Sequence, residues 1–169
     1  YNESVEYRLT LLRNNGPEAV EENQWDFTYI DVPVEDLNAG ASDMAWGDYD
    51  GDGDPDLLIA SELETRLLRN DSGTLVPTET ALPGYLEDNS QAEFDLDSVS
   101  WADYDNDGDL NLLIPSVYSP GVFEYRAALM RNDGSDADGN YLFTEVDAGL
   151  APTQHAQSIW ADYDTDGDL

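Results

Sequence analysis

The chain has 169 residues and a formal net charge of −32, which comes from 38 acidic residues against six arginines and no lysine. Hydrophobic residues make up 40% of it and aromatic residues 11%, which argues against disorder and predicts a folded core. Nucleic acids and anionic membranes bind through clustered Lys and Arg, so neither is expected as a partner. The absence of cysteine excludes disulfides, thiolate metal sites and cysteine nucleophiles.

Strand-like segments recur along the chain in a fixed order. Trp46, Trp101 and Trp160 each precede an aspartate-rich loop and are spaced 55 and 59 residues apart. A short apolar run follows each complete loop, then a Leu-x-Arg-Asn segment, and then a segment such as Phe27-Thr28 or Phe143-Thr144. Runs of this length bounded by turn residues predict strands, so the repeating unit is predicted to contain four.

Four parts of the chain follow from this repeat. Residues 1–36 hold the last two strands of a unit, residues 41–82 and 97–147 hold two whole units, and residues 156–169 begin another. Four-stranded units at a period of about 55–60 residues predict an all-β fold built from β-propeller blades with antiparallel strands.

The loops concentrate negative charge at alternate positions. At a separation of ~5 Å and an effective dielectric of ~20, each pair of aspartates repels by about 3 kcal/mol, so a counter-charge is expected. Calcium accepts six to eight oxygen ligands and suits this density of carboxylates. The predicted calcium ligands are Asp48, Asp50, Asp52, Asp54 (through its carbonyl) and Asp56 in the first loop, Asp103, Asp105, Asp107, Asp109 and Asn111 in the second, and Asp162, Asp164, Asp166 and Asp168 in the third.

The spacing distinguishes these loops from EF-hands. Loop positions 1, 3, 5 and 6 agree with an EF-hand, but position 12, which needs a bidentate Glu, is Ile59 in the first loop and Ile114 in the second. A weaker second site is expected, because Asn111 replaces the acid at position 9. The third loop reaches only position 8, Leu169, and lacks a ninth-position ligand in this sequence.

The loop Asp-Tyr-Asp-x-Asp-Gly-Asp, followed by Leu-Leu-Ile and later by Leu-x-Arg-Asn, resembles FG-GAP/VCBS repeats, which are related to the blades of integrin alpha-subunit heads. The resemblance covers nearly the whole chain. It implies a calcium-stabilised β-propeller, usually extracellular and often involved in binding or adhesion. We therefore expect an extracellular or cell-surface location and a noncatalytic scaffold whose ligand is a protein or a carbohydrate.

Two alternative functions remain open at this stage. The partial units at the two ends could complete each other between neighbouring chains, with the strand Val5 to Leu12 of one copy beside the third loop of the next, giving a head-to-tail filament or surface subunit. The mundane explanation is a segment of a longer propeller. A propeller-based polysaccharide lyase or hydrolase is the other alternative, although no catalytic constellation is identifiable: the single histidine, His155, has no elbow motif near it or near Ser158.

Two further roles are predicted as structural. The fixed place of Trp46, Trp101 and Trp160 before each loop predicts blade-core positions rather than a ligand-stacking set. The six arginines all fall in the equivalent strand of each unit, which favours ion pairs with nearby carboxylates.

The insertion from Tyr118 to Tyr125 is the first candidate for a binding loop.

Overall fold

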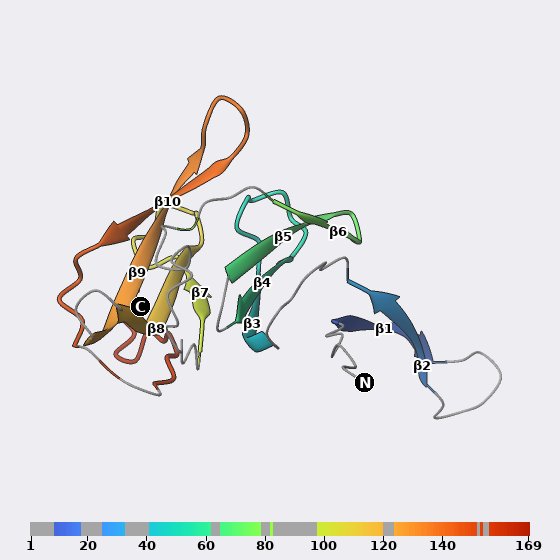
Figure 1. Cartoon of the computed structure of the whole chain (residues 1–169), viewed down its shortest axis with the longest axis horizontal. Helices are drawn as coiled ribbons and strands as arrows, with labels where there is room; N and C mark the ends of the chain where they lie inside the picture. The colour runs from blue at the N-terminus through green and yellow to red at the C-terminus, as the bar shows by residue number, and fades with distance from the viewer. Residues whose placement is uncertain are drawn as a thin grey trace, which may run out of the picture. The chain divides into compact units, whose positions relative to one another are not determined.

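The computed structural model describes residues 9–17, 25–32, 41–61, 65–78, 82, 98–119, 124–151, 153 and 156–169. These residues form ten strands in three antiparallel sheets, with no helix among them. The all-β, antiparallel prediction is therefore confirmed, and a closed propeller stays a prediction. The chain divides into two compact units, residues 1–38 and 39–169, each of which is described by itself (Figure 1).

The described residues of the first unit form a single hairpin. Strand β1 (Thr10–Pro17) pairs with β2 (Trp25–Asp31), and the register slips by one residue between Asn14 and Gly16. The bulge is possible because Gly16 adopts a φ of 93°, a conformation that favours glycine. Trp25, Phe27 and Tyr29 alternate along β2 and are all exposed.

The second unit contains two four-stranded sheets whose strands pair in chain order. The first sheet is built from β3 (Ala41–Gly47), β4 (Asp56–Ser61), β5 (Thr65–Asp71) and β6 (Thr74–Pro77). The second is built from β7 (Ser100–Ala102), β8 (Asn111–Ser119), β9 (Glu124–Ser135) and β10 (Tyr141–Val146). Each sheet is a simple meander, as expected for a propeller blade.

Local sequence explains the shapes of the strands. Ser72 and Gly73 both have positive φ, 51° and 95°, and form the two-residue turn that joins β5 to β6. The pairing of β8 with β9 becomes irregular between Ile114 and Val117, next to Pro115, which cannot donate to a ladder. These two strands then continue to Ser119 and Glu124, so Tyr118 and Tyr125 are cross-strand partners; residues 120–123 of the proposed binding loop lie outside the described residues.

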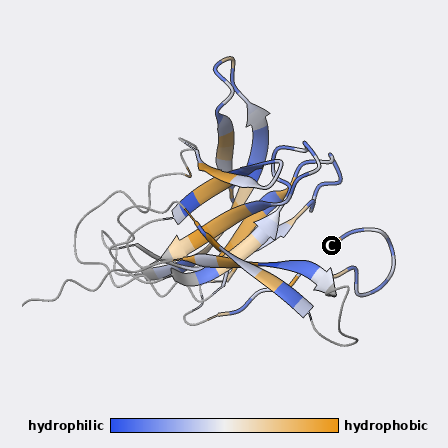
Figure 2. Cartoon of the chain, turned by 90° about the vertical axis from the view of Figure 1, so that its right-hand side faces the viewer, coloured by the Kyte–Doolittle hydropathy of each residue, from blue (hydrophilic) through white to orange (hydrophobic). Residues whose placement is uncertain are grey.

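The hydrophobic core of the second unit lies between its two sheets. Hydrophobic residues gather along the strands while the loops are hydrophilic (Figure 2). The core consists of Tyr49, Leu58, Ala60 and Leu67 from the first repeat and Val99, Leu112, Ile114, Ala128, Met130 and Phe143 from the second. Each large apolar side chain that is fully buried stabilises the fold by about 1.5–3 kcal/mol, so face-to-face packing of the sheets is a main source of stability.

The first strands of successive repeats lie beside each other. Val99, just before β7, donates its N–H to a carboxylate oxygen of Asp43 on β3 at 2.7 Å. The hydroxyls of Ser100 and Ser158 are 3.0 Å apart, which places the start of residues 156–169 next to β7. No strand is assigned within these last described residues.

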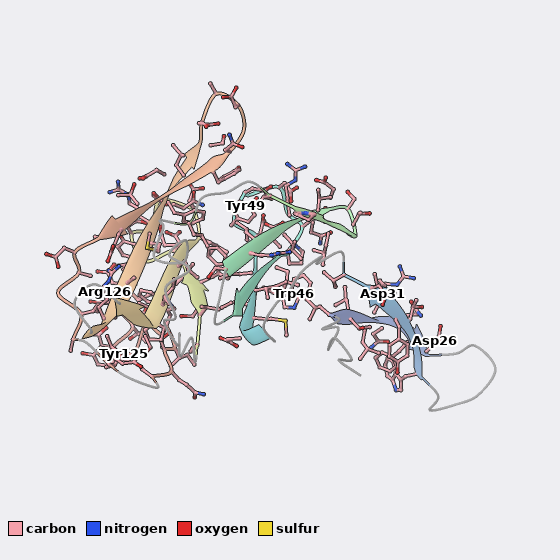
Figure 3. The ribbon with its side chains drawn as sticks, in the orientation of Figure 1. Asp26, Asp31, Trp46, Tyr49, Tyr125 and Arg126 are labelled. Carbon is pink, nitrogen blue, oxygen red and sulfur yellow. The ribbon has the colours of Figure 1, made fainter. Side chains whose placement is uncertain are left out.

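The predicted core role of the tryptophans is confirmed for Trp101, which packs against the core, and is wrong for Trp46, which is 45% exposed. Figure 3 shows Trp46 and Tyr49. The difference has a physical reason. Trp101 stacks on Tyr49 of the preceding repeat and Trp160 stacks on Tyr104, whereas Trp46 has no such tyrosine before it in its unit.

Candidate metal centre

The first aspartate loop connects β3 to β4 and is shaped by its own side chains. Asp48 accepts the N–H of Gly53 at 3.0 Å, and Asp50 accepts the N–H of Asp52 at 3.2 Å. Gly51 and Gly53 supply the positive φ values of 72° and 95° that let the chain curl around these carboxylates. The fold of the loop therefore depends on hydrogen bonds from its own main chain to its aspartates.

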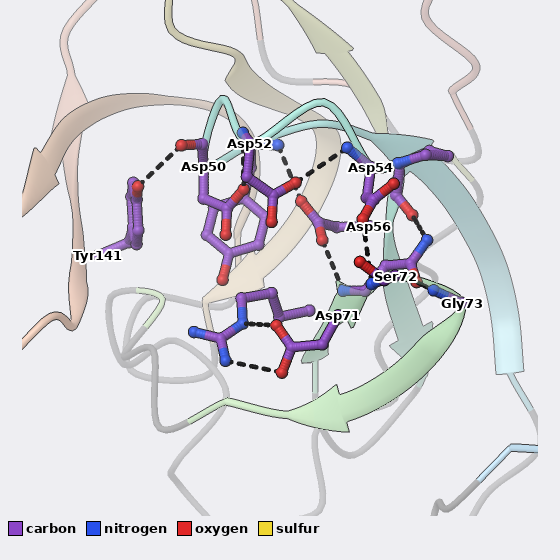
Figure 4. Close-up of polar contacts among 12 residues, drawn as sticks. Asp50, Asp52, Asp54, Asp56, Asp71, Ser72, Gly73 and Tyr141 are labelled. Atoms are coloured by element: carbon purple, nitrogen blue, oxygen red, sulfur yellow. Dashed lines mark hydrogen bonds and ion pairs between the residues drawn. The ribbon is translucent and has the colours of Figure 1, made fainter.

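Three of the five aspartates in this loop converge. Carboxylate oxygens of Asp48, Asp50 and Asp56 all lie within 4.8 Å of one another. Asp54 instead accepts the N–H of Ser72 at 3.0 Å, so its side chain binds the turn between β5 and β6 (Figure 4). Asp52 accepts the N–H of Asp54 at 2.9 Å and is outside the group of three.

Asp56, at loop position 9, anchors the site inside the protein. Its side chain is fully buried, and its two oxygens accept main-chain N–H groups of Tyr49 at 3.1 Å and Asn70 at 2.8 Å. Burial raises the pKa of Asp56 to about 6, and the charges of Asp50 and Asp52 also raise it, although the two N–H donors act in the opposite direction. A buried carboxylate in this setting is stabilised by a nearby positive charge.

The first loop fits a hard divalent cation. Oxygen Oδ1 of Asp48 is buried and has no hydrogen-bond partner, an arrangement that a cation would satisfy. Burial, together with the charges of Asp52 and Asp48, raises the pKa of Asp50. All of these donors are carboxylate oxygens, the ligand type that calcium prefers.

The second loop also brings three carboxylates together, but at positions 1, 3 and 5 of the loop instead of positions 1, 3 and 9. Oxygens of Asp103, Asp105 and Asp107 lie within 4.8 Å of one another. Asn111 occupies the place of Asp56: its Oδ1 accepts the N–H of Asn132 at 2.9 Å, and its Nδ2 donates to Asp105 at 3.2 Å. The side chain of Asn111 therefore donates an N–H to a carboxylate of the loop, whereas Asp56 offers only oxygen atoms. For this reason Asn111 fits the role of an oxygen ligand less well than Asp56 does.

The third loop forms the same turn, and the sequence reaches only position 8 of it. Asp162, Asp164 and Asp166 converge within 4.8 Å, and Asp162 accepts the N–H of Gly167 at 3.0 Å. Its fourth position is Thr165, whose φ of 62° is sparsely populated for a β-branched residue. Asp168 and Asp109, at position 7 of their loops, lie outside the groups of three.

The recurring asparagine of the Leu-x-Arg-Asn segment has a role that the sequence did not reveal. Asn70 donates from Nδ2 to the carbonyl of Pro55 at 2.9 Å, and its N–H binds Asp56. Asn132 does the same toward Leu110 and Asn111, at 3.4 and 2.9 Å. The recurrence of Arg-Asn at a fixed distance after each loop was the available signal, but it did not identify the bonding partners.

The predicted pairing of arginines with carboxylates is confirmed for three of the described arginines, whereas Arg13 donates to the amide oxygen of Asn15 at 3.0 Å. Arg69 binds Asp71 at 2.9 Å, Arg131 binds Asp133 at 2.7 Å, and Arg126 pairs with Glu145. Arg8 lies outside the described residues, as does the first half of the predicted strand Val5 to Leu12.

The described residues give no support to a Ser-His-Asp arrangement. His155 lies outside them, and the hydroxyl of Ser158 is engaged with Ser100. Within the same residues, no helix is long and apolar enough to cross a membrane.

Comparison with known proteins gives one match to a family of repeats. The model of the FG-GAP-like repeat family matches residues 48–114, which run from the first aspartate loop to the strand after the second. No curated protein and no solved structure matches the chain significantly. The matched segment contains both complete aspartate loops and strands β4 to β6 between them, and the match is consistent with an FG-GAP-type repeat.

Proposed function

We propose that this chain is a calcium-stabilised β-propeller segment that serves as a noncatalytic binding or adhesion scaffold outside the cell. The observation that carries the proposal is the group of Asp48, Asp50 and Asp56, in which one carboxylate is fully buried and one buried oxygen lacks a partner. FG-GAP repeats often bind calcium and are typical of extracellular proteins, in keeping with this donor set.

The cation acts through its charge in this proposal. A bound calcium ion would neutralise the repulsion among the loop carboxylates and tie the end of β3 to the start of β4. Affinities of about 10⁻⁴ to 10⁻³ M suit extracellular calcium modules. The scaffold would then present its loops and strand edges to a protein or carbohydrate ligand, with the metal in a structural role.

Titration calorimetry with calcium and with magnesium tests this proposal. We expect calcium to bind, and Asp50→Asn to remove the tightest site. Asp138→Asn is the matched control, because Asp138 lies in the exposed β9–β10 turn, away from the three loops. Absence of calcium binding to the unaltered chain, or equal binding by both variants, would overturn the proposal.

Head-to-tail self-association is a second candidate, favoured by one observation. Tyr49 and Tyr104 stack on the tryptophan of the next repeat, whereas their counterpart Tyr163 is 90% exposed, and Trp46 is 45% exposed. If Tyr163 stacked on Trp46 of another copy, the tyrosine–tryptophan contact that joins successive repeats would also join neighbouring chains. Sedimentation velocity over a range of concentrations should then show oligomers that Tyr163→Ala abolishes; a monomer at every concentration would exclude this candidate.

A further inference from the structure

The first aspartate loop is held from outside by the second repeat. The Nδ2 of Asn132, on β9, donates to the main-chain oxygen of Tyr49 at 2.9 Å. The hydroxyl of Tyr141, on β10, donates to the main-chain oxygen of Asp50 at 3.0 Å (Figure 4). Tyr49 lies between the converging residues Asp48 and Asp50, and Asp50 is itself one of the three, so the second repeat fixes the backbone that carries their carboxylates.

These two side chains are themselves held in place. Asn132 is only 2% exposed; it also donates to the carbonyl of Leu110 and the side chain of Asn111, and its Oδ1 accepts the N–H of Gly134. The ring of Tyr141 packs edge-on against Tyr49 with centroids 4.9 Å apart. One asparagine therefore bonds to the backbones of the first and second loops at once, while Tyr141 bonds to the first.

Fixing the backbone matters because a cation site is strongest when its ligands are held before binding. Asp50 has neighbouring carboxylates that repel it, so a loop freed from its external hydrogen bonds would spread its carboxylates apart in the absence of a cation. Binding would then have to reorder the loop, which lowers affinity.

We propose that Tyr141 and Asn132 are positioning residues for the cation site of the first loop, so that occupation of this loop and docking of the second sheet on the first stabilise each other. The inference rests on the proposed function, because it requires the first loop to bind calcium. Reciprocity follows from linkage: if docking raises the affinity of the loop, calcium strengthens docking by the same factor.

Hydrogen exchange followed by mass spectrometry over a calcium titration of the whole chain tests this inference, because it reports each loop separately. Tyr141→Phe keeps the ring and removes only the hydroxyl. One neutral hydrogen bond corresponds to about a three- to tenfold change, so the calcium concentration that half-protects residues 48–56 should rise by this factor. The concentrations for residues 103–111 and 162–169 should stay unchanged.

Two other variants complete the experiment. Tyr29→Phe is the matched control, since Tyr29 is 74% exposed and lies in the first unit. Asn132→Ala should weaken protection of the first and second loops together; if it fails to fold, Tyr141→Phe alone decides the matter.

The outcomes separate the two hypotheses. Unchanged half-protection of residues 48–56 in Tyr141→Phe would overturn the positioning role, as would an equal shift in all three loops, which indicates general destabilisation. If the unaltered chain shows no calcium-dependent protection of residues 48–56, the proposed calcium function falls, and this inference falls with it.

Discussion

The ring of Tyr49 lies nearly parallel to the ring of Trp101, with centroids 6.4 Å apart and an interplanar angle of 17°. Tyr104 and Trp160 repeat this arrangement at 6.3 Å and 17°. In each pair, the tyrosine at the second position of one aspartate loop meets the tryptophan before the next loop. The contact between successive repeats is therefore built directly onto the loop that is proposed to hold the cation.

Gly47→Ala should destabilise this contact. A Cβ at position 47 would lie 2.7 Å from Cδ1 of Trp101 and 3.0 Å from a methyl group of Leu110, closer than carbon atoms normally approach. Overpacking of this kind costs about 1–3 kcal/mol, which is only partly offset by the entropy that alanine removes from the unfolded chain. Denaturant unfolding should show a lower midpoint at an unchanged slope.

Tryptophan fluorescence provides a second measurement of the same variant, because displacement of Trp101 changes its environment. Ala45→Gly is not a suitable control, since Ala45 packs against the core. Gly139→Ala is better, because it lies in an exposed turn with open space around it, although its φ of 85° adds local strain. A midpoint for Gly47→Ala equal to that of the unaltered chain would show that the Trp101 ring moves aside freely.

Exchanging the residues at loop position 9 should reverse the order of calcium affinity of the first two loops. Asp56→Asn removes a buried carboxylate from the first loop, and Asn111→Asp adds one to the second. If the carboxylates of each loop share a cation, as proposed, calcium affinity should fall by about tenfold or more in the first variant and rise in the second. Calorimetric titration of each variant measures both changes.

Both variants should still fold, because the hydrogen bond at loop position 9 can be kept. In both loops the ninth residue accepts a main-chain N–H, from Asn70 in the first and Asn132 in the second, and either side chain can keep that bond. Folding in the presence of calcium should therefore survive in both variants. Equal calcium affinities in the two variants and the unaltered chain would mean that position 9 does not contribute to binding.

Stability should depend on pH with opposite signs in the presence and absence of calcium. The pKa of Asp56 is raised to about 6 from 3.8, so the folded chain binds this proton more tightly than the unfolded chain does. Without metal, Asp56 therefore adds stability as the pH falls through the window between these values, and this contribution is lost as the pH rises through about 6. With saturating calcium, protons compete with the cation, and acidification should destabilise.

Thermal melts from pH 7 to pH 5, in chelator and in calcium, measure both slopes. Asp56→Asn should flatten the slope in chelator, because it removes the titrating group. Asp133 and Asp136 have pKa values lowered by hydrogen bonding, so their contribution is lost at lower pH and does not account for a gain of stability on acidification. Identical slopes with and without calcium would contradict this prediction.

The sequence was sufficient to predict the repeat and the strands that follow the first two loops, and the predicted ligands include the three carboxylates that converge in each loop; Asp52, Asp54, Asp109 and Asp168 were predicted as well but lie outside these groups. The spacing of Asp48, Asp50 and Asp56 specifies a turn whose geometry depends on local hydrogen bonds and on two glycines. Strand prediction succeeded for a similar reason, because the run Leu57–Ala60 is too short for a helix and is bounded by turns.

Relationships between distant residues could not be predicted in this way. Asn132 lies 83 positions after Tyr49, and Tyr141 lies 91 positions after Asp50, so only the packing of one sheet on the other brings these groups together. The direction of the Asn111 amide is likewise set by the N–H of Asn132, which occupies its oxygen. The exposure of Trp46 depends on which tyrosine precedes it, and a local pattern contains no such information.

Thermal unfolding of the chain in calcium, after chelation, and after calcium is restored is the most direct test of the claim that the aspartate loops are structural cation sites. A free calcium concentration of about 100 times the dissociation constant stabilises each site by about 2.7 kcal/mol, which corresponds to a rise in Tm of about 5–10 °C. We expect chelation to lower the Tm by at least this amount, calcium to restore it, and Asp50→Asn to reduce the response while Asp138→Asn preserves it. A Tm that is the same in chelator and in calcium would contradict the claim.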